Sequence, residues 1–195
     1  MIITMQPSTV AKPFSDPNWL FEPKWDGYRA ICYYDRHRIR FISRRNNDLT
    51  KRFPELQRIE VRAESAIIDG EIVAIDDAGL PCFDELRKRH RSCSIVFYAF
   101  DLIELNGQDL RELPLTKRKA SLKTILRRTR NNRIRFTQHI VGEGLVLFAE
   151  LEQLHVEGMV AKKLESKYES GRTREWLKVK TSAGKEEMRK RIENW

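Results

Sequence analysis

Residues 22–29 read Glu22-Pro23-Lys24-Trp25-Asp26-Gly27-Tyr28-Arg29, and this octet is the most informative part of the 195-residue chain. Lys24 stands between two carboxylates, and Gly27 would allow a ligand to come close to the backbone. A lysine amine is a poor nucleophile while protonated, since its ordinary pKa is about 10.4. Desolvation or nearby positive charge lowers that pKa and makes the amine reactive. Lys24 is therefore a candidate nucleophile; the alternative is a surface lysine beside an Asp26-Gly27 turn.

The composition indicates a basic globular protein of about one domain. The formal net charge is +9, with basic residues clustered in segments 36–52 and 111–135. Such a balance favours an anionic partner, of which nucleic acid is the commonest, over a merely solvated basic surface. The three cysteines are odd in number and lack zinc-binding spacing, which indicates reduced thiols. No apolar run approaches the length of a membrane span, so we expect no membrane partner.

The hydrophobic pattern predicts mostly strands, with helices in a minority. Helices are expected at residues 116–129, with Thr116 as N-cap, and at residues 144–154. Because the helices are set apart from the strands instead of alternating with them, we expect an α+β fold with antiparallel sheets and packed helices. The expected strands cover residues 28–34, 38–43, 66–75, 94–105, 133–139, 159–164 and 176–180.

Two stretches downstream carry groups that suit a nucleotide. Asp69-Gly70-Glu71 comes at the start of an apolar strand. A carboxylate there can hold a divalent cation or a ribose hydroxyl; the alternative is a turn with a solvated glutamate. Phe97-Tyr98-Ala99-Phe100 provides aromatic rings, one of which can stack on a purine. The alternative for these rings is a place in the core.

Two further stretches lie near the C-terminus. Glu157-Gly158-Met159-Val160-Ala161-Lys162 again combines a carboxylate, a glycine and a cation around a strand. Trp176-Leu177-Lys178-Val179-Lys180 places two lysines on the same side of a strand, because side chains alternate between faces. Paired lysines suit phosphates as point charges. The alternative is an amphipathic edge strand.

Together these motifs resemble those of the nucleotidyltransferase superfamily, which contains ATP-dependent DNA ligases, RNA ligases and mRNA capping enzymes. The octet matches the family pattern Glu-x-Lys-x-Asp-Gly-x-Arg at every fixed position, and the other four motifs follow in the family order. The form Trp-Asp-Gly-Tyr-Arg and the ending at residues 175–180 look most like bacterial DNA ligases of the end-joining type. The resemblance covers residues 7–180 and implies an ATP-grasp-like adenylation fold.

The resemblance also implies roles for the octet and the segment after it. Lys24 would be the nucleophile that takes AMP from ATP as a phosphoramidate. Glu22 would lie where the family recognises adenine, and Arg29 would contact the ribose or the phosphates. Arg44 matches an arginine that contacts the nucleotide and the DNA 5′-phosphate, although the adjacent Arg45 leaves the choice between these two arginines open.

The later motifs receive roles in the same way. Glu71 would bind the ribose or a metal ion, and Glu157 would bind the metal, Mg²⁺ or Mn²⁺. Phe100 would stack on adenine. Lys178 and Lys180 would hold the region of the α-phosphate.

A three-step reaction is implied by the resemblance. Lys24 attacks the α-phosphate of ATP and pyrophosphate leaves; AMP then passes to the 5′-phosphate of a nick; the 3′-hydroxyl finally displaces AMP and seals the strand. Each step is an in-line displacement at phosphorus, so positioning and charge neutralisation should supply most of the catalysis. The expected partner is nicked double-stranded DNA, in DNA repair and recombination.

The resemblance implies an adenylation domain at residues 1–180, followed by a charged tail at 181–195 that is expected to be helical from Gly184. Family ligases continue into an OB-fold domain, and we expect this protein to be without one. We favour a natural minimal protein over a fragment of a longer ligase, with a partner protein as a possible source of that domain. A monomer in a bacterial cytoplasm, bound to the nucleoid when on DNA, is expected.

Two other functions stand beside DNA ligation. An RNA ligase or a capping-type enzyme would use the same lysine chemistry, and a preference for GTP would indicate capping. A catalytically weakened module that only binds nicks would keep the fold without needing Lys24.

Overall fold

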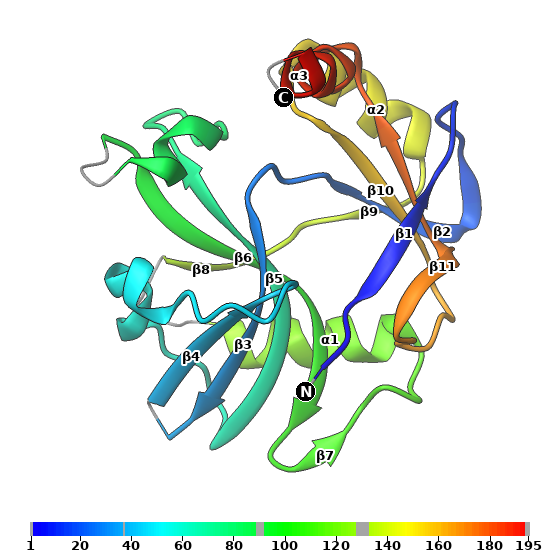
Figure 1. Cartoon of the computed structure of the whole chain (residues 1–195). Helices are drawn as coiled ribbons and strands as arrows, with labels where there is room; N and C mark the ends of the chain where they lie inside the picture. Colours follow the sequence, from blue (N-terminus) through cyan, green and yellow to red (C-terminus); the bar gives the residue numbers. More distant parts are fainter. Residues whose placement is uncertain (1, 37, 89–91, 128–132, 194–195) are drawn as a thin grey trace. The chain divides into compact units, whose positions relative to one another are not determined.

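The computed structural model describes residues 2–36, 38–88, 92–127 and 133–193. The described chain divides into two compact units. Unit 1 contains residues 2–4, 26–137 and 167–170, apart from the positions that are not described. Unit 2 contains residues 5–25, 138–166 and 171–193. Each unit is built around its own sheet (Figure 1).

Unit 1 holds a six-stranded sheet in the order β4-β3-β5-β6-β7, with β8 beside β6. Only β6 and β8 run parallel among the described pairs of this sheet. The strands predicted at residues 28–34 and 38–43 are confirmed and form an antiparallel pair, since residues 30–35 of β3 pair with β4. The strands are β3 (Tyr28–Asp35), β4 (Arg38–Ser43), β5 (Ser65–Ile75), β6 (Ser94–Leu105), β7 (Gln108–Asp109) and β8 (Ile134–Phe136).

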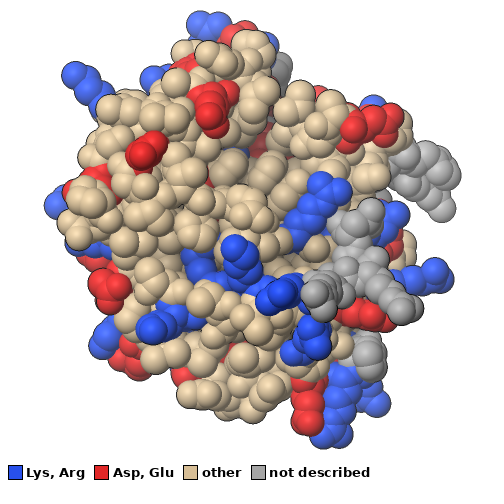
Figure 2. Space-filling model, turned by 180° about the vertical axis from the view of Figure 1, so that it is seen from behind, with Lys and Arg blue, Asp and Glu red and all other residues tan. Residues whose placement is uncertain are grey.

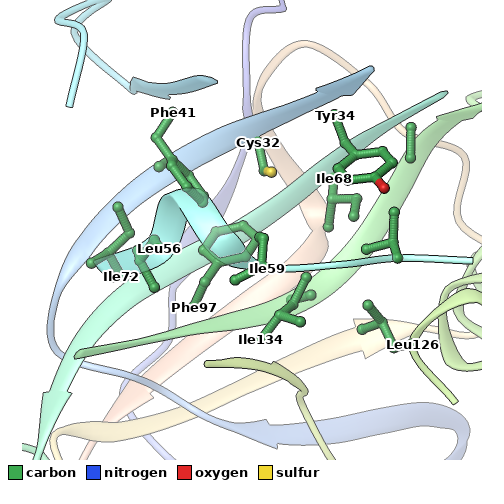
Figure 3. Close-up of a cluster of buried hydrophobic side chains, with 14 of the residues drawn as sticks. Cys32, Tyr34, Phe41, Leu56, Ile59, Ile68, Ile72, Phe97, Leu126 and Ile134 are labelled. Carbon is green, nitrogen blue, oxygen red and sulfur yellow. The ribbon is translucent and has the colours of Figure 1, made fainter. Parts of the chain in front are cut away.

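The core of unit 1 lies on one face of this sheet. Alternate residues of β3, including Cys32 and Tyr34, point into it, as the period of two in a strand requires. Phe41 and Phe97 meet edge to face there, with ring centroids 5.1 Å apart (Figure 3). Helix α1 (Leu115–Leu126) packs on β6 and β8. Three short 3₁₀ helices complete the unit: η1 (Thr50–Arg52), η2 (Pro54–Arg58) and η3 (Phe83–Arg87).

Unit 2 holds a five-stranded sheet in the order β1-β11-β10-β2-β9. Its pairs are antiparallel except for β1 with β11. Helix α2 (Gly144–Gln153) packs on β2 and β10, and α3 (Ser182–Glu193) packs on β11. The strands are β1 (Met5–Thr9), β2 (Asp16–Pro23), β9 (Ile140–Gly142), β10 (Gly158–Lys163) and β11 (Gly171–Lys180).

The predicted α+β class is confirmed, but the sheets are mixed instead of purely antiparallel. The Asp69-Gly70-Glu71 motif lies in the middle of β5, not at a strand entrance. Helix α3 begins at Ser182, two residues before the expected start at Gly184. No helix within the described residues is long and apolar enough to cross a membrane.

Helix α1 differs from the prediction at both of its ends. The helix starts at Leu115, so the cap position falls on Pro114 and not on Thr116. Proline has a fixed φ and no N–H, so it belongs at the beginning of a helix, where that N–H has no partner anyway. The helix ends at Leu126, because Arg127 is extended; the predicted end at residue 129 lies outside the described residues.

Candidate active site

The two faces of the unit 2 sheet differ in character, and the strand register places three of the predicted site residues, Glu22, Lys178 and Lys180, on the same face. One face carries the apolar side chains that pack with α2, among them Phe21, Met159 and Val179. Since side chains alternate along each strand, the residues between them point to the opposite face. Glu22 pairs with Val160, and Val160 pairs with Lys178, so the three lie in one row across the sheet. This second face is therefore charged.

Lys24 follows β2 directly and is held in place at both its backbone and its side chain. Its backbone N–H donates to the Gly158 carbonyl over 2.8 Å. Its ammonium forms an ion pair with Glu157, and the Lys180 ammonium lies 3.1 Å from the other Glu157 oxygen. The Lys24 side chain is 23% exposed, so it is not a freely solvated surface lysine.

The carboxylate of Glu157 is stabilised in its ionised form. Burial alone would raise the pKa of Glu157, but the attraction of Lys24 and Lys180 and their hydrogen bonds outweigh burial. The net pKa lies below the ordinary value for a glutamate. Glu157 thus remains charged near neutral pH and can fix the ammonium of Lys24 in one position.

Lys178 adds a third cation to this group. Its pKa is lowered, first because the side chain is partly buried and then because Lys24, Lys180 and Arg172 are nearby. Cations that are held close together against their mutual repulsion provide a site for an anion, and phosphate is the anion that lysine pairs suit. The predicted proximity of Lys24, Glu157, Lys178 and Lys180 is present within unit 2.

Glu22 has a partner that sequence reasoning did not assign. Its carboxylate forms an ion pair with Lys162 over 2.7 Å, and both side chains are 2% exposed. The Lys162 ammonium also lies over the ring of Trp176, 4.1 Å from its centroid. Lys162 and Trp176 are direct neighbours across β10 and β11. Only the strand register brings these residues together, so spacing in the sequence could not have revealed the pair.

Unit 1 holds the predicted Arg29 in a buried network. The Arg29 guanidinium donates to both oxygens of Asp69, over 3.1 and 2.7 Å, and Asp69 is fully buried. The Tyr168 hydroxyl donates to the same carboxylate over 2.6 Å. Burial would lower the pKa of Arg29, but Asp69 outweighs burial and raises it overall. Glu71 is the direct neighbour of Arg29 across β3 and β5. Asp69 and Tyr168 are thus partners of the predicted Arg29 that sequence reasoning did not assign.

A bulge in β6 gives Phe100 its place. Asp69 pairs with Asp101 and Gly70 pairs with Ala99, so Phe100 is the extra residue between them. A bulge of this kind redirects a side chain out of the regular alternation. The Phe100 ring is half-buried, and the Arg29 guanidinium lies 5.2 Å from its centroid. Phe97, by contrast, is fully buried in the core, which was the alternative to nucleotide stacking for these aromatic rings.

The structure requires a glycine at position 27 because the chain there lies against another strand. A Cβ at this position would overlap the carbonyl oxygen of Ile72 and lie 3.1 Å from Glu71 Cγ. The glycine therefore lets the chain pass close to the backbone of β5, which places the octet beside Glu71. The close approach that we predicted for a ligand is made by a strand of the protein itself.

The structure leaves the choice between Arg44 and Arg45 open. Both lie in the turn after β4, and both side chains are exposed. The Arg44 backbone N–H donates to the Arg29 carbonyl over 3.3 Å, which brings the backbone of Arg44 next to Arg29 within unit 1.

The two predicted metal ligands are Glu71, in unit 1, and Glu157, in unit 2. The described residues contain no group of three or more His, Cys, Asp or Glu side chains that would form a complete cage. Magnesium does not require one, because it commonly binds to one or two carboxylates together with substrate phosphates and water. Two carboxylates, rather than thiols or imidazoles, are a donor set that fits Mg²⁺ or Mn²⁺.

Comparison with known proteins decides the family. The family described as ATP dependent DNA ligase domain matches residues 2–180. This chain belongs to that family. The ligase domain shares 32% identity over 176 residues with the SPbeta prophage-derived DNA ligase-like protein LigB of Bacillus subtilis, covering 88% of this chain and 64% of LigB. It is 33% identical to the Multifunctional non-homologous end joining DNA repair protein LigD of Mycobacterium tuberculosis, covering 83% of this chain and 21% of LigD.

Solved structures agree with this family. A mycobacterial DNA ligase D complexed with ATP and MES superimposes with a TM-score of 0.79 at 29% identity, covering 91% of this chain and 60% of that chain. The ligase domain of LigD from M. tuberculosis gives a TM-score of 0.77 at 28% identity, again with 91% and 60% coverage. The nucleotidyltransferase adenylation fold expected from the motifs is thereby confirmed.

Proposed function

We propose that this chain is the nucleotide-transferring part of an ATP-dependent DNA ligase, with Lys24 as the nucleophile. The observation that carries the proposal is the arrangement of Lys24, Glu157, Lys178 and Lys180 in unit 2, which holds one amine beside a site for phosphate. Residues 1–180 would form the adenylation domain. The chain spans less than two thirds of the relatives compared above, so the activity of the whole protein is part of this proposal.

The first step forms a bond between Lys24 Nζ and the α-phosphorus of ATP. The ammonium of Lys24 loses one proton to solvent before the attack, because only the neutral amine has a lone pair. The bond from the phosphorus to the bridging oxygen breaks, pyrophosphate leaves, and the nitrogen loses a second proton to solvent once the P–N bond has formed. Glu157 orients the amine before the attack, while Lys178 and Lys180 balance the charge of the phosphate oxygens. The product is a covalent lysine–AMP phosphoramidate.

Glu22 and Lys162 would read the edge of the purine. A carboxylate accepts a hydrogen bond from an exocyclic amino group, and an ammonium donates one to a ring nitrogen. Adenine presents such a donor and acceptor side by side, whereas guanine presents a carbonyl in place of the amino group. The Glu22–Lys162 ion pair therefore supports ATP over GTP and speaks against a capping-type enzyme.

Residues of unit 1 keep the roles implied by the family. Phe100 would stack on adenine, and Arg29 would contact the ribose or the phosphates. Glu71 in unit 1 and Glu157 in unit 2 would each be a ligand for Mg²⁺ or Mn²⁺, which supplies charge neutralisation for phosphate oxygens when bound. Arg44, or Arg45 beside it, would contact the DNA 5′-phosphate.

The surface of the protein supports DNA as the acceptor of AMP. Figure 2 shows exposed Lys and Arg side chains on the surface of the protein. Within unit 1, β4 and the turn after it expose a row of cations, namely Arg38, Arg40, Arg44, Arg45 and Lys51. Such a row suits a phosphate backbone without reading its sequence. We propose nicked duplex DNA as the substrate and the bacterial nucleoid as the place of action.

Transfer of AMP to a nick tests this proposal. The purified chain, after reaction with radiolabelled ATP, is mixed with nicked duplexes that carry a 5′-phosphate on either DNA or RNA. We expect label on the DNA 5′-phosphate and none with Lys24→Ala. Preferred transfer to RNA would favour an RNA ligase. Nick binding that is equal in wild type and Lys24→Ala, without any transfer, would favour the binding module.

A further inference from the structure

The first turn of α3 is fastened to the segment that carries Glu157. This contact joins two places of unit 2 that are far apart in the sequence, the end of β11 and the start of β10. Neither the motifs nor the proposed function assigns a role to the residues that make it.

Thr181 makes the central connections. It is fully buried, its backbone N–H donates to the Glu157 carbonyl over 3.2 Å, and its hydroxyl donates to the Val156 carbonyl over 2.5 Å. The same hydroxyl oxygen accepts the backbone N–H of Gly184 over 3.1 Å. A threonine hydroxyl that accepts the N–H three residues later is a helix N-cap. One side chain thus caps α3 and holds the backbone on the N-terminal side of Glu157.

Gly184 completes the contact from the helix. A Cβ at Gly184 would overlap the Glu157 carbonyl oxygen, and would lie 2.8 Å from its carbonyl carbon and 3.1 Å from its Cα. Only glycine allows the helix to approach this closely. The Lys180 ammonium lies 3.4 Å from the Gly184 carbonyl and also pairs with Glu157. Backbone and side chain of Glu157 are therefore both held from the end of β11 and the first turn of α3.

We propose that Thr181 and Gly184 are positioning residues for the Lys24–Glu157 pair, so that the first turn of α3 sets the geometry of the nucleophile. This inference rests on the proposed function of Lys24. Glu157 fixes Lys24 only if its own backbone is fixed, and the hydrogen bonds of Thr181 provide that restraint.

The role predicts an effect on the rate of Lys24 adenylation and not on ATP affinity. A reacting atom that is misplaced by about 1 Å can cost about 100-fold in rate, because the attack needs a defined approach. The side chains that would read the purine, Glu22 and Lys162, lie on β2 and β10 and pair with each other over 2.7 Å, away from the first turn of α3 in the sequence. The ATP concentration for half-maximal rate should therefore stay nearly constant when the hydrogen bonds of Thr181 are removed or Gly184 is replaced.

The test measures the rate of covalent AMP transfer to the full chain over a range of ATP concentrations, for four variants. Thr181→Val keeps the volume and removes the hydroxyl; we expect the maximal rate to fall about tenfold or more, with the half-saturating ATP within about threefold of wild type. Thr181→Ser keeps the hydroxyl and should restore the rate to within about threefold. Gly184→Ala should lower the rate by about 100-fold. Lys185→Ala is the matched control, an exposed neighbour on the same helix, and should behave as wild type.

Thermal unfolding of each variant is measured as well, which distinguishes a folded variant that reacts slowly from one that has lost its fold. A folded Thr181→Val that adenylates at the wild-type rate would overturn the inference, because Thr181 would then be only a helix cap. The inference would also be overturned if Thr181→Val changed only the half-saturating ATP concentration, or if Thr181→Ser failed to restore the rate. If wild type itself forms no adduct, the proposed function fails, and that result is separate from an unchanged rate in Thr181→Val.

Discussion

At the scale of single residues, the chemistry centres on Glu157, a carboxylate shared by two lysines. Its side chain is 9% exposed, and the ion pairs with Lys24 and Lys180 offset the desolvation of burial. Without Glu157, the ammonium groups of Lys24, Lys178 and Lys180 would face one another with less compensation. The residue that we propose to orient Lys24 is therefore also expected to stabilise unit 2.

This double role predicts a stability that depends on pH. The pKa of Glu157 in the folded protein lies below its unfolded value of about 4.3, so its ionised form stabilises the fold above that pH. The stabilisation is lost as pH falls through the folded-state pKa. We expect Glu157→Gln to lower the free energy of unfolding by about 2 kcal/mol at pH 7, and the difference from wild type to shrink toward pH 3.

Urea unfolding at pH 7, 5 and 3 measures that difference. Glu165→Gln serves as the control, because Glu165 is exposed in the same unit and should give nearly the wild-type curve at each pH. A Glu157→Gln difference that stays constant from pH 7 to pH 3 would show that the ionised carboxylate is not the stabilising group.

The sequence was sufficient to predict the residues that stand on regular spacing. Lys178 and Lys180 share one face of β11 because side chains alternate along a strand. It was not sufficient for Asp69, Tyr168 and Lys162, whose roles depend on partners. Tyr168 and its acceptor Asp69 are 99 residues apart in the sequence, so only the folded chain brings them together.

At the scale of secondary structure, α1 shows how a charged pattern can mislead. The sequence presents a basic helix with one solvated face, a candidate for lying on DNA. The structure buries Arg118 completely and leaves Lys119 only 3% exposed, so both belong to the inner face of α1, while the apolar Ala120 is exposed. Arg118 donates to both oxygens of the buried Asp101 on β6, over 2.8 and 2.9 Å. The charge on α1 is thus partly a structural element that joins the helix to the sheet.

This ion pair predicts a loss of stability in Arg118→Ala. Removal of one partner leaves the Asp101 carboxylate buried without its counter-charge, which typically costs about 3–5 kcal/mol. Lys117→Ala on the same helix is the control, because Lys117 is exposed and such changes usually stay within about 0.5 kcal/mol. Urea unfolding of both variants measures the effect. An Arg118→Ala variant as stable as Lys117→Ala would contradict this account of α1.

Some strands could be predicted from their own residues, whereas others depend on partners far away in the sequence. Residues 94–105 were predicted as a strand and β6 has those bounds, since a long apolar run with a turn after it is a local signal. β1 and β2 were not predicted, because they join the sheet only through β11 and β10, at the far end of the sequence. The bulge that redirects Phe100 likewise depends on the register of β5 and β6.

At the scale of the whole molecule, each unit is assembled from segments that are distant in the sequence. Unit 2 draws on both ends of the chain, and residues 167–170 return to unit 1 between β10 and β11. The octet itself crosses from one unit to the other along the chain, with Lys24 in unit 2 and Arg29 in unit 1. The order of the motifs identified the family, but it did not reveal that the chain divides into two units.

The measurement that tests the central claim most directly is the intact mass of the chain after incubation with ATP and Mg²⁺, followed by peptide mapping. We predict a gain of one AMP, located on the peptide that contains Lys24 and absent in Lys24→Ala. Lys12→Ala, which removes an exposed lysine of the same unit, should gain AMP as wild type does. A chain that gains no AMP, or one in which the adduct persists in Lys24→Ala, would contradict the assignment of Lys24 as the nucleophile.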